Sequence, residues 1–486
     1  MIHRYKTVIF GFALLAPGAV AQPGPADAIL DVRPQAWWGV LVVDVSSGEV
    51  HYARNAERSF IPASVTKLYT TAAVLDQLGP DYRYETRLYA DGPVANSILQ
   101  GNLVVRGAGD PTTGTPGELH LAIFHAWADS LLARGVRQVQ GDVIGDDDIF
   151  DDVLLGDSWS WDDLVYAYAA PVSGLTFHEN VVDITVTPTH PGAPAQVTWT
   201  PLVPGFFDVV NHSTTRARGA LLREDYERGA TGNRIIISSQ VPVGQIDSES
   251  ISVQNPTLYF MHALREALLA RGIAVLGQPR DIDELSIKPE YGRAWVVARH
   301  QSVPLEELIA ETNKDSHNLF AEHLLRTLGV ERPVAGEDLE PGSAAMGVAA
   351  AQVTFAAAQV DTSRLQLVDG SGLSRKNLVS PRMTVNLLRY MAHHPNQSVR
   401  HTFQASLPVG GTDGTLEYRF PAGAPAHRVV QAKTGTLGNV STLAGYVSSG
   451  SRKQLAFAIF CNHFTGKYSD IRSIQDRLVN HLASLP

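Results

Sequence analysis

The stretch FIPASVTKLYTTAAVL, residues 60–75, places Ser64 and Lys67 three residues apart at the predicted start of a helix. The apolar residues that follow recur at helical spacing and predict a buried face: Leu68, Ala72 and Leu75. Ser64 and Lys67 would then lie one turn apart on the same side of that helix. Two interpretations are open: an ordinary helix-start serine beside a solvated lysine, or a nucleophile with its own base.

The second interpretation requires Lys67 to be neutral part of the time. A serine hydroxyl attacks a carbonyl at neutral pH only when a base removes its proton, and only a neutral lysine can be that base. The pKa of Lys67 must therefore be lowered by burial and by nearby positive charge. We expect Lys433 to supply that charge if the chain folds it alongside. The positive end of the helix near Ser64 also favours the negative charge that develops during attack.

Ser316-His317-Asn318 is the only Ser-x-Asn triplet in the chain, just as Ser64 and Lys67 form the only Ser-x-x-Lys. The triplet precedes the apolar pattern LFAEHLL and therefore lies in a loop or on the first turn of a helix. A hydroxyl there can relay a proton to a leaving amine, and an amide can hold a peptide group of the substrate. The alternative is a helix cap formed by Asp315, Ser316 or Asn318.

The third motif is Lys433-Thr434-Gly435-Thr436, which follows a strand-like run. A strand edge can pair with an extended peptide, while Lys433 and the threonine hydroxyls bind a terminal carboxylate. We expect Gly435 to let the ligand backbone approach closely. The backbone amides of Thr436 and Ser64 could form an oxyanion hole. Read in isolation, the motif is better explained as a solvated lysine at a strand end.

In this order the three motifs resemble those of the penicillin-recognising serine enzymes. The chain is most similar to the D-alanyl-D-alanine carboxypeptidase/endopeptidase family, peptidase S13, also called low-molecular-mass class C penicillin-binding proteins. Four further segments resemble sequences of that family: GNLVVRGAGDPT (101–112), GDVIGDDDIFDD (141–152), WSWDDLVYAYAAPVSGLTFHEN (159–180) and DGSGLSRKN (369–377). The resemblance implies an α+β fold, a transpeptidase domain like that of serine β-lactamases, in which helices flank an antiparallel five-stranded sheet.

The resemblance also implies roles for single residues. Ser64 would be the acylated nucleophile and Lys67 its base, with Ser316 as proton shuttle. The substrate-binding residues would be Asn318, for the peptide amide, and, for the carboxylate of the terminal D-alanine, Lys433, Thr434, Gly435 and Thr436. No metal or other cofactor is implied.

A side-chain pocket for the diamino acid of the stem peptide is a further implication. By motif position its candidates are Asp163 and Arg375, with Tyr168 as an aromatic wall. A loop carboxylate and a surface arginine are the equally open alternatives. Gly438 offers no side chain where some relatives place a polar one, so the pocket can differ in detail.

The length of 486 residues predicts more than one domain. Residues 1–21 combine a basic start, a short apolar run and small residues before a cleavage point, as a secretory signal peptide does. Residues 22–85 and 292–486 would form the DD-peptidase domain. Residues 86–291, rich in short β-type runs, would be an inserted region of two lobes.

Composition restricts the partners. A formal charge of −10 argues against nucleic acid, and no mature segment is long enough to span a membrane. Cys461 stands alone in an apolar run and predicts a buried, inert thiol. Asp146-Asp147-Asp148 lacks the spacing of a calcium loop and is interpreted as solvated turn residues.

The leading hypothesis is a periplasmic serine DD-peptidase that acts on peptidoglycan stem peptides and is acylated by β-lactams. It would cleave the terminal D-Ala-D-Ala bond, with D-alanyl cross-links as a second substrate. A β-lactamase on the same fold and a catalytically silent peptidoglycan-binding protein remain alternatives. Rapid antibiotic turnover would favour the former, and muropeptide binding without release of D-alanine the latter. The sequence does not predict an oligomeric state.

Overall fold

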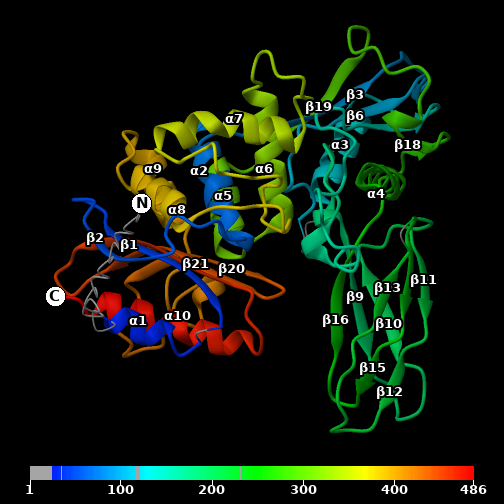
Figure 1. Ribbon diagram of the computed structural model, residues 1–486. Coiled ribbons are helices and arrows are strands. Elements are labelled where there is room, and N and C mark those ends of the chain that lie inside the picture. The colour runs from blue at the N-terminus through cyan, green and yellow to red at the C-terminus, as the bar shows by residue number, and fades with distance from the viewer. Residues whose placement is uncertain (1–23, 34, 116–120, 230) are drawn as a thin grey trace, which may run out of the picture.

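The computed structural model describes residues 24–33, 35–115, 121–229 and 231–486. The predicted signal peptide, residues 1–21, lies outside them. The ribbon divides into a body of helices around one sheet and a tall β-rich column beside it (Figure 1). In the described residues, no helix is both long enough and apolar enough to cross a bilayer.

One antiparallel five-stranded sheet runs through the body, in the order β2-β1-β22-β21-β20. Its strands are β1 (Trp37–Asp44), β2 (Val50–Arg54), β20 (Val430–Leu437), β21 (Val440–Ser448) and β22 (Gln454–Asn462). β1 and β22 pair along their whole length, which joins the two ends of the chain in one sheet. Nearly every residue of β1, β21 and β22 is buried, because helices cover both faces of the sheet.

The helices form two layers about this sheet. Below it in Figure 1 lie α1 (Pro25–Leu30) and α10 (Tyr468–Ala483). Above it lie α2 (Thr66–Leu78), α5 (Leu305–Lys314), α6 (Asn318–Glu331), α7 (Ala344–Ala357), α8 (Pro381–Ala392) and α9 (Gln397–Ala405). Each layer has its own apolar core against the sheet. The predicted sandwich of helices around a five-stranded antiparallel sheet is confirmed.

The chain leaves the body after α2 and forms the column before it returns. Its upper lobe carries two sheets, β18-β8-β6-β3-β19 and β17-β7-β5-β4, packed on α3 (Ala122–Ala133) and α4 (Pro256–Ala270). The strands are β3 (Glu85–Ala90), β4 (Val94–Ala95), β5 (Ile98–Leu99), β6 (Leu103–Arg106), β7 (Gln138–Val139), β8 (Val143–Asp146), β17 (Ala274–Val275), β18 (Pro279–Asp281) and β19 (Trp295–Gln301).

The lower lobe consists of short strands around a small apolar core of its own. They are β9 (Val181–Thr187), β10 (Gln196–Thr200), β11 (Asp208–Asn211), β12 (Thr214–Arg216), β13 (Tyr226–Arg228), β14 (Arg234–Ile237), β15 (Gln240–Pro242) and β16 (Asp247–Ser252). β19 lies beyond residue 291, where the sequence analysis ended the insertion. It pairs with β3, so the strands that enter and leave the upper lobe are neighbours.

Two expectations concern residues outside the catalytic motifs. Cys461 lies buried in β22, and burial raises the pKa of its thiol to about 12, as expected for an inert cysteine. The interpretation of Asp146-Asp147-Asp148 as solvated turn residues is wrong for two of the three. Asp146 is buried, and Asp147 accepts hydrogen bonds from Ser173 and Thr257. The tertiary contacts of α4 and the following loops cover them.

Candidate active site

The three motifs, far apart in the sequence, meet at one place in the body. Ser64 lies in a single 3₁₀ turn, Ala63–Val65, directly before α2. Ser316 and Asn318 lie where α6 begins, and Lys433 lies on β20, the edge strand of the sheet. The helix-cap interpretation of Ser64 is wrong, because Val65 precedes α2 and no side chain caps this end.

Lys67 is fully buried, and its side-chain nitrogen Nζ contacts three oxygen atoms. Its Nζ lies 3.1 Å from Ser64 Oγ, 2.6 Å from Asn318 Oδ1 and 2.7 Å from the backbone oxygen of Ser371. Two of these partners are carbonyl oxygens, which can only accept. A neutral Lys67 therefore gives both of its hydrogens to them and presents its lone pair to the hydroxyl of Ser64.

Burial lowers the pKa of Lys67 from its usual range to about 7. Burial, the first of the two causes expected from the sequence, is the main one. Asp369 and Glu322 lie nearby and oppose the shift, so desolvation alone outweighs two carboxylates. The two lysines also repel each other: burial, and then the charge of Lys67, hold the pKa of Lys433 well below its usual range.

The loop that holds Lys67 contains residues that sequence reasoning missed. Glu322, one turn into α6 from Asn318, accepts hydrogen bonds from the backbone amides of Gly370 and Ser371. That fixes the Ser371 carbonyl on Lys67. Burial and the charge of Asp369 raise the pKa of Glu322 to about 7. Within DGSGLSRKN only the tight Asp-Gly-Ser-Gly turn hinted at this role, because a backbone carbonyl leaves no mark in a sequence.

Lys433 is buried rather than solvated. Its Nζ donates to Ser316 Oγ at 2.9 Å and to the backbone oxygen of Thr434 at 2.9 Å. Ser316 itself adopts a left-handed backbone conformation, φ +63°, which turns its side chain out of the path of α6. Ser316 thus lies between the second lysine and the cleft, where a hydroxyl can pass on a proton.

His317, the middle residue of the second motif, caps α6. Its Nδ1 accepts from the backbone N–H of Phe320 at 3.4 Å, and its Nε2 lies 3.0 Å from Glu179 Oε2. The expected caps Asp315, Ser316 and Asn318 are therefore not the ones used. The Asn318 amide is oriented from both sides, since its Nδ2 donates to the backbone oxygen of Tyr168 at 2.7 Å while its Oδ1 accepts from Lys67.

Gly435 has a different purpose from the one expected. A Cβ at this position would lie 2.3 Å from Thr442 Oγ1 and 2.7 Å from the backbone oxygen of Pro62. The space that the glycine leaves is taken by the chain itself, so that β20 can approach the turn carrying Ser64. Thr434 faces away from that contact and donates its hydroxyl to Thr415 at 2.8 Å.

Two hollows open on either side of Ser64 and share Ser64, Ser316 and Thr436 in their walls. The first has a volume of about 510 Å³ and is lined by Thr415, Thr434, Arg419 and Arg472, among others. The second, about 670 Å³, reaches toward the insertion. Its walls contain Asn318 and all three residues expected in the side-chain pocket, Asp163, Tyr168 and Arg375.

Within the larger hollow the charged groups stand on opposite elements. Tyr168 donates its hydroxyl to Asp163 Oδ1 at 2.8 Å, and the two aromatic rings of Tyr166 and Tyr168 stack. Arg375 donates to the backbone oxygen of Gly438 at 3.0 Å. A Cβ at Gly438 would lie 2.6 Å from the Arg375 guanidinium, so the missing side chain makes room for the arginine.

Comparisons with known proteins identify the family of the chain. The chain matches the D-Ala-D-Ala carboxypeptidase 3 (S13) family over residues 26–485. It belongs to that family. The resemblance drawn from the three motifs is thereby confirmed.

Curated members of the S13 family extend over most of the chain. The D-alanyl-D-alanine carboxypeptidase of Actinomadura sp. (strain R39) is 34% identical over 92% of this chain and 81% of its own. The D-alanyl-D-alanine carboxypeptidase DacB of Haemophilus influenzae is 27% identical over 88% of this chain and 85% of its own. The crystal structure of penicillin binding protein 4 (dacB) from H. influenzae has a TM-score of 0.81 at 25% identity, covering 95% of this chain and 100% of that one.

Family membership and the assembled motifs make this S13 protein a serine DD-peptidase. The roles of the individual side chains and the finer choice of substrate are taken up next.

Proposed function

We propose that this S13 protein hydrolyses the terminal D-Ala-D-Ala bond of peptidoglycan stem peptides through an acyl-enzyme on Ser64. One observation carries the proposal: the buried Nζ of Lys67 lies 3.1 Å from Ser64 Oγ, with two carbonyl oxygens on its other sides. This is the arrangement in which a lysine with a pKa near 7 can act as a general base. The carboxypeptidase relative from Actinomadura supports the choice of substrate.

In the proposed reaction Lys67 takes the proton of Ser64 as the hydroxyl oxygen attacks the carbonyl carbon of the penultimate D-alanine. The backbone amides of Ser64 and Thr436 would stabilise the oxyanion. The proton would pass through Ser316 to the departing amine of the last D-alanine, as the C–N bond breaks. Water then attacks the ester, and its proton returns to Ser64 by the same route.

The two hollows suggest how the peptide is held. The terminal carboxylate would lie in the smaller hollow near Thr434 and Thr436, with Lys433 buried behind them. A bound carboxylate would raise the lowered pKa of Lys433 and so favour its charged form. The rest of the stem peptide would lie in the larger hollow. There the second hydrogen of the Asn318 amide group can donate to a substrate carbonyl.

The far end of the larger hollow suits a zwitterionic side chain. Asp163 would bind the ammonium group and Arg375 the carboxylate of a diamino acid such as diaminopimelate, with Tyr168 against its methylenes. Such a pocket would also accept D-alanyl cross-links as substrates of an endopeptidase reaction. Because these substrates lie in the cell wall, we propose that the protein acts in the periplasm after export. β-Lactams would acylate Ser64 as substrate mimics.

Mass spectrometry after exposure to penicillin tests the nucleophile. We expect the wild-type protein to gain one covalent adduct and Ser64→Ala to gain none, while Ser130→Ala, on α3 of the insertion, is acylated like the wild type. An adduct that survives Ser64→Ala would contradict the proposal. Analysis of products from cross-linked muropeptides then separates the activities: free D-alanine reports the carboxypeptidase and resolved cross-links the endopeptidase. Rapid release of hydrolysed penicillin would instead favour a β-lactamase.

A further inference from the structure

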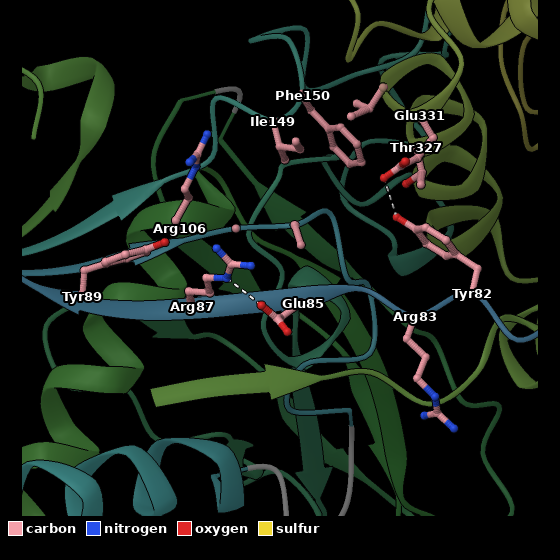
Figure 2. A pocket seen from close by; sticks show the side chains of 13 residues that line it. Tyr82, Arg83, Glu85, Arg87, Tyr89, Arg106, Ile149, Phe150, Thr327 and Glu331 are labelled. Atoms are coloured by element: carbon pink, nitrogen blue, oxygen red, sulfur yellow. Dashed lines mark hydrogen bonds and ion pairs between the residues drawn. The ribbon is translucent and has the colours of Figure 1, made fainter. Parts of the chain in front are cut away.

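A second pocket lies away from the catalytic cleft, between the upper lobe of the insertion and the body. It has a volume of about 320 Å³. β3 and β6 form its floor, the loop with Ile149 and Phe150 forms one wall, and the last turns of α6 form another. Figure 2 shows Arg87 and Arg106 rising from neighbouring strands into this space, with Phe150 above them and Tyr82 to one side.

The floor carries an unusual row of like charges. Arg87 on β3 pairs directly with Arg106 on β6 and with Arg299 on β19. Directly opposed residues of an antiparallel sheet point to the same face, so the three side chains stand side by side. Like charges in that arrangement destabilise a sheet. We refer to these three residues as the arginine row.

The chain balances only part of this charge. Glu85 bonds to Arg87 Nε at 2.6 Å and lies 3.5 Å from Arg299 Nη1, so one carboxylate is shared by two arginines. Arg106 lies 3.9 Å from the buried Asp146, which also accepts from the Tyr291 hydroxyl. The side chains of Arg87 and Arg106 are 42% and 54% exposed, so an added anion can reach them.

The remaining walls have a different chemistry. Tyr82, Tyr89 and Phe150 present aromatic surface to the pocket. On the α6 side, Tyr82 donates its hydroxyl to Glu331 at 3.0 Å (Figure 2). A ligand therefore meets positive charge at the arginine row, aromatic walls in the middle, and an acidic acceptor for hydroxyl or ammonium groups at the Glu331 end.

α6 connects this pocket with the catalytic cleft. Asn318 begins the helix at the catalytic end, and Thr327 and Glu331 line the pocket at its other end. A helix of this length spans roughly 20 Å. A polymeric substrate that repeats along its length can occupy both places at once.

We propose that this pocket is an accessory site for the substrate polymer, which binds a carboxylate-bearing muropeptide segment through Arg87 and Arg106. The inference rests on the proposed function, since it takes the ligand to be peptidoglycan. The guanidinium groups bind the carboxylate, as their geometry favours. The aromatic side chains pack on the sugar or peptide, and Glu331 accepts from its hydroxyl or amino groups.

Direct binding to Ser64→Ala protein tests the site, because this background cannot turn the ligand over. The probe is a disaccharide-tripeptide, which lacks the D-Ala-D-Ala bond. We expect charge reversal in R87E/R106E to weaken binding at least about tenfold, as loss of charge-assisted bonds does. The control R452E/K453E makes the same change of charge on the exposed β21–β22 turn and should bind as before. Equal affinity in both variants would overturn the proposal.

The chemistry of the ligand is tested by changing the probe. The same muropeptide with amidated carboxylates should lose its affinity, whereas inorganic phosphate should not compete. Retained binding of the amidated probe, or effective competition by phosphate, would overturn the assignment to a muropeptide carboxylate. If R87E/R106E fails to fold, R87Q/R106Q removes the charges without reversing them, and the same outcomes apply.

Activity with Ser64 restored separates this inference from the proposed function. R87E/R106E should release D-alanine from a short soluble peptide within about twofold of the wild-type rate, but from intact sacculi several-fold more slowly. Loss of activity on both substrates would show a structural role for the arginines and overturn the inference. No activity in the wild type itself would overturn the proposed function instead.

Discussion

Positively charged side chains lie near both ends of α6, but they are buried near one end and half exposed near the other. At the first end Lys67 and Lys433 are fully buried, and each cation has hydrogen-bond partners from its own chain. At the other end the arginine row is half exposed and shares one carboxylate between two guanidinium groups. Both places hold cations close to one another within a chain of formal charge −10.

This difference in burial corresponds to two functions of a basic side chain, proton transfer and anion binding. Burial lowers the pKa of both lysines, and the pKa of Lys67, about 7, lets this lysine exchange protons at neutral pH. Arginine cannot be deprotonated in this way and serves where a fixed charge must meet an anion. The catalytic end is therefore built for proton transfer and the other end for binding. The predictions that follow test this contrast, from the largest expected effect to the smallest.

Replacing the base should have the largest effect. Lys67→Met keeps an apolar chain of similar size but removes the group that accepts the Ser64 proton. We expect the rate of acylation to fall about 10³–10⁴-fold, measured with a chromogenic β-lactam. A fall of less than tenfold would mean that another group is the base.

The pH dependence of the wild type tests the same contrast without a mutation. The pKa of Lys67 is lowered to about 7, and only its neutral form accepts a proton. The neutral fraction rises with pH, so kcat/KM should increase through an acidic limb centred near pH 7. A limb near the ordinary lysine value, above pH 10, would leave Ser64 without its base.

Ser316→Ala tests the proposed proton relay to the leaving amine. The substitution removes the hydroxyl that Lys433 contacts and leaves Ser64 and Lys67 in place. We expect kcat to fall about 10²–10³-fold with a smaller change in KM, because the lost step is proton transfer rather than binding. A change confined to KM would make Ser316 a binding residue only.

Glu322→Gln should have a moderate effect that shows in the pH profile. The carboxylate of Glu322 raises the pKa of Lys67, so removing its charge should lower that pKa and move the acidic limb to lower pH. The glutamine oxygen can still accept from the amide of Ser371, so we expect only a several-fold loss of kcat. An unmoved limb would show that the two groups do not interact.

Arg87→Gln should have the smallest effect when the stability of the fold is measured, apart from the loss of ligand binding expected at the accessory site. The arginine lies between two others, so relief of repulsion offsets the lost bond to Glu85. We expect the free energy of unfolding to change by less than about 0.5 kcal/mol, measured by urea denaturation. A loss of 2 kcal/mol or more would show that the arginine row holds the lobe together, and the contrast between the two ends of α6 would fail.

Much of the body could be predicted from patterns. The strand pair at WWGVLVVDVSSGEVHYARN and the closing helix follow from apolar periodicity and turn residues, and both are present as β1, β2 and α10. The sequence analysis does not single out α7 or α9. The helix α7 is apolar on nearly all sides and therefore shows no clear periodicity. The helix α9 is 9 residues long and buries only Val399, Thr402 and Phe403, a pattern too short to stand out in the sequence. Packing against neighbouring helices, rather than the local sequence, makes these two segments helical.

Some of the site residues could be recognised from the sequence and others could not. The three motifs were recognisable because their chemistry requires particular side chains at short, fixed spacings. Glu322 and the Ser371 carbonyl were missed because their contribution runs through backbone atoms. The role of Gly435 was assigned to the ligand, since the sequence does not show that Pro62 and Thr442 occupy the space beside it.

By itself the sequence determined the candidate nucleophile, the order of the motifs and the family, because these depend on residue type and local spacing. Tertiary structure alone decided the protonation of Lys67, since its pKa follows from burial beneath residues up to about 300 positions away. The arginine row likewise exists only in the folded protein. Arg87, Arg106 and Arg299 become neighbours only through strand register, which no local pattern encodes.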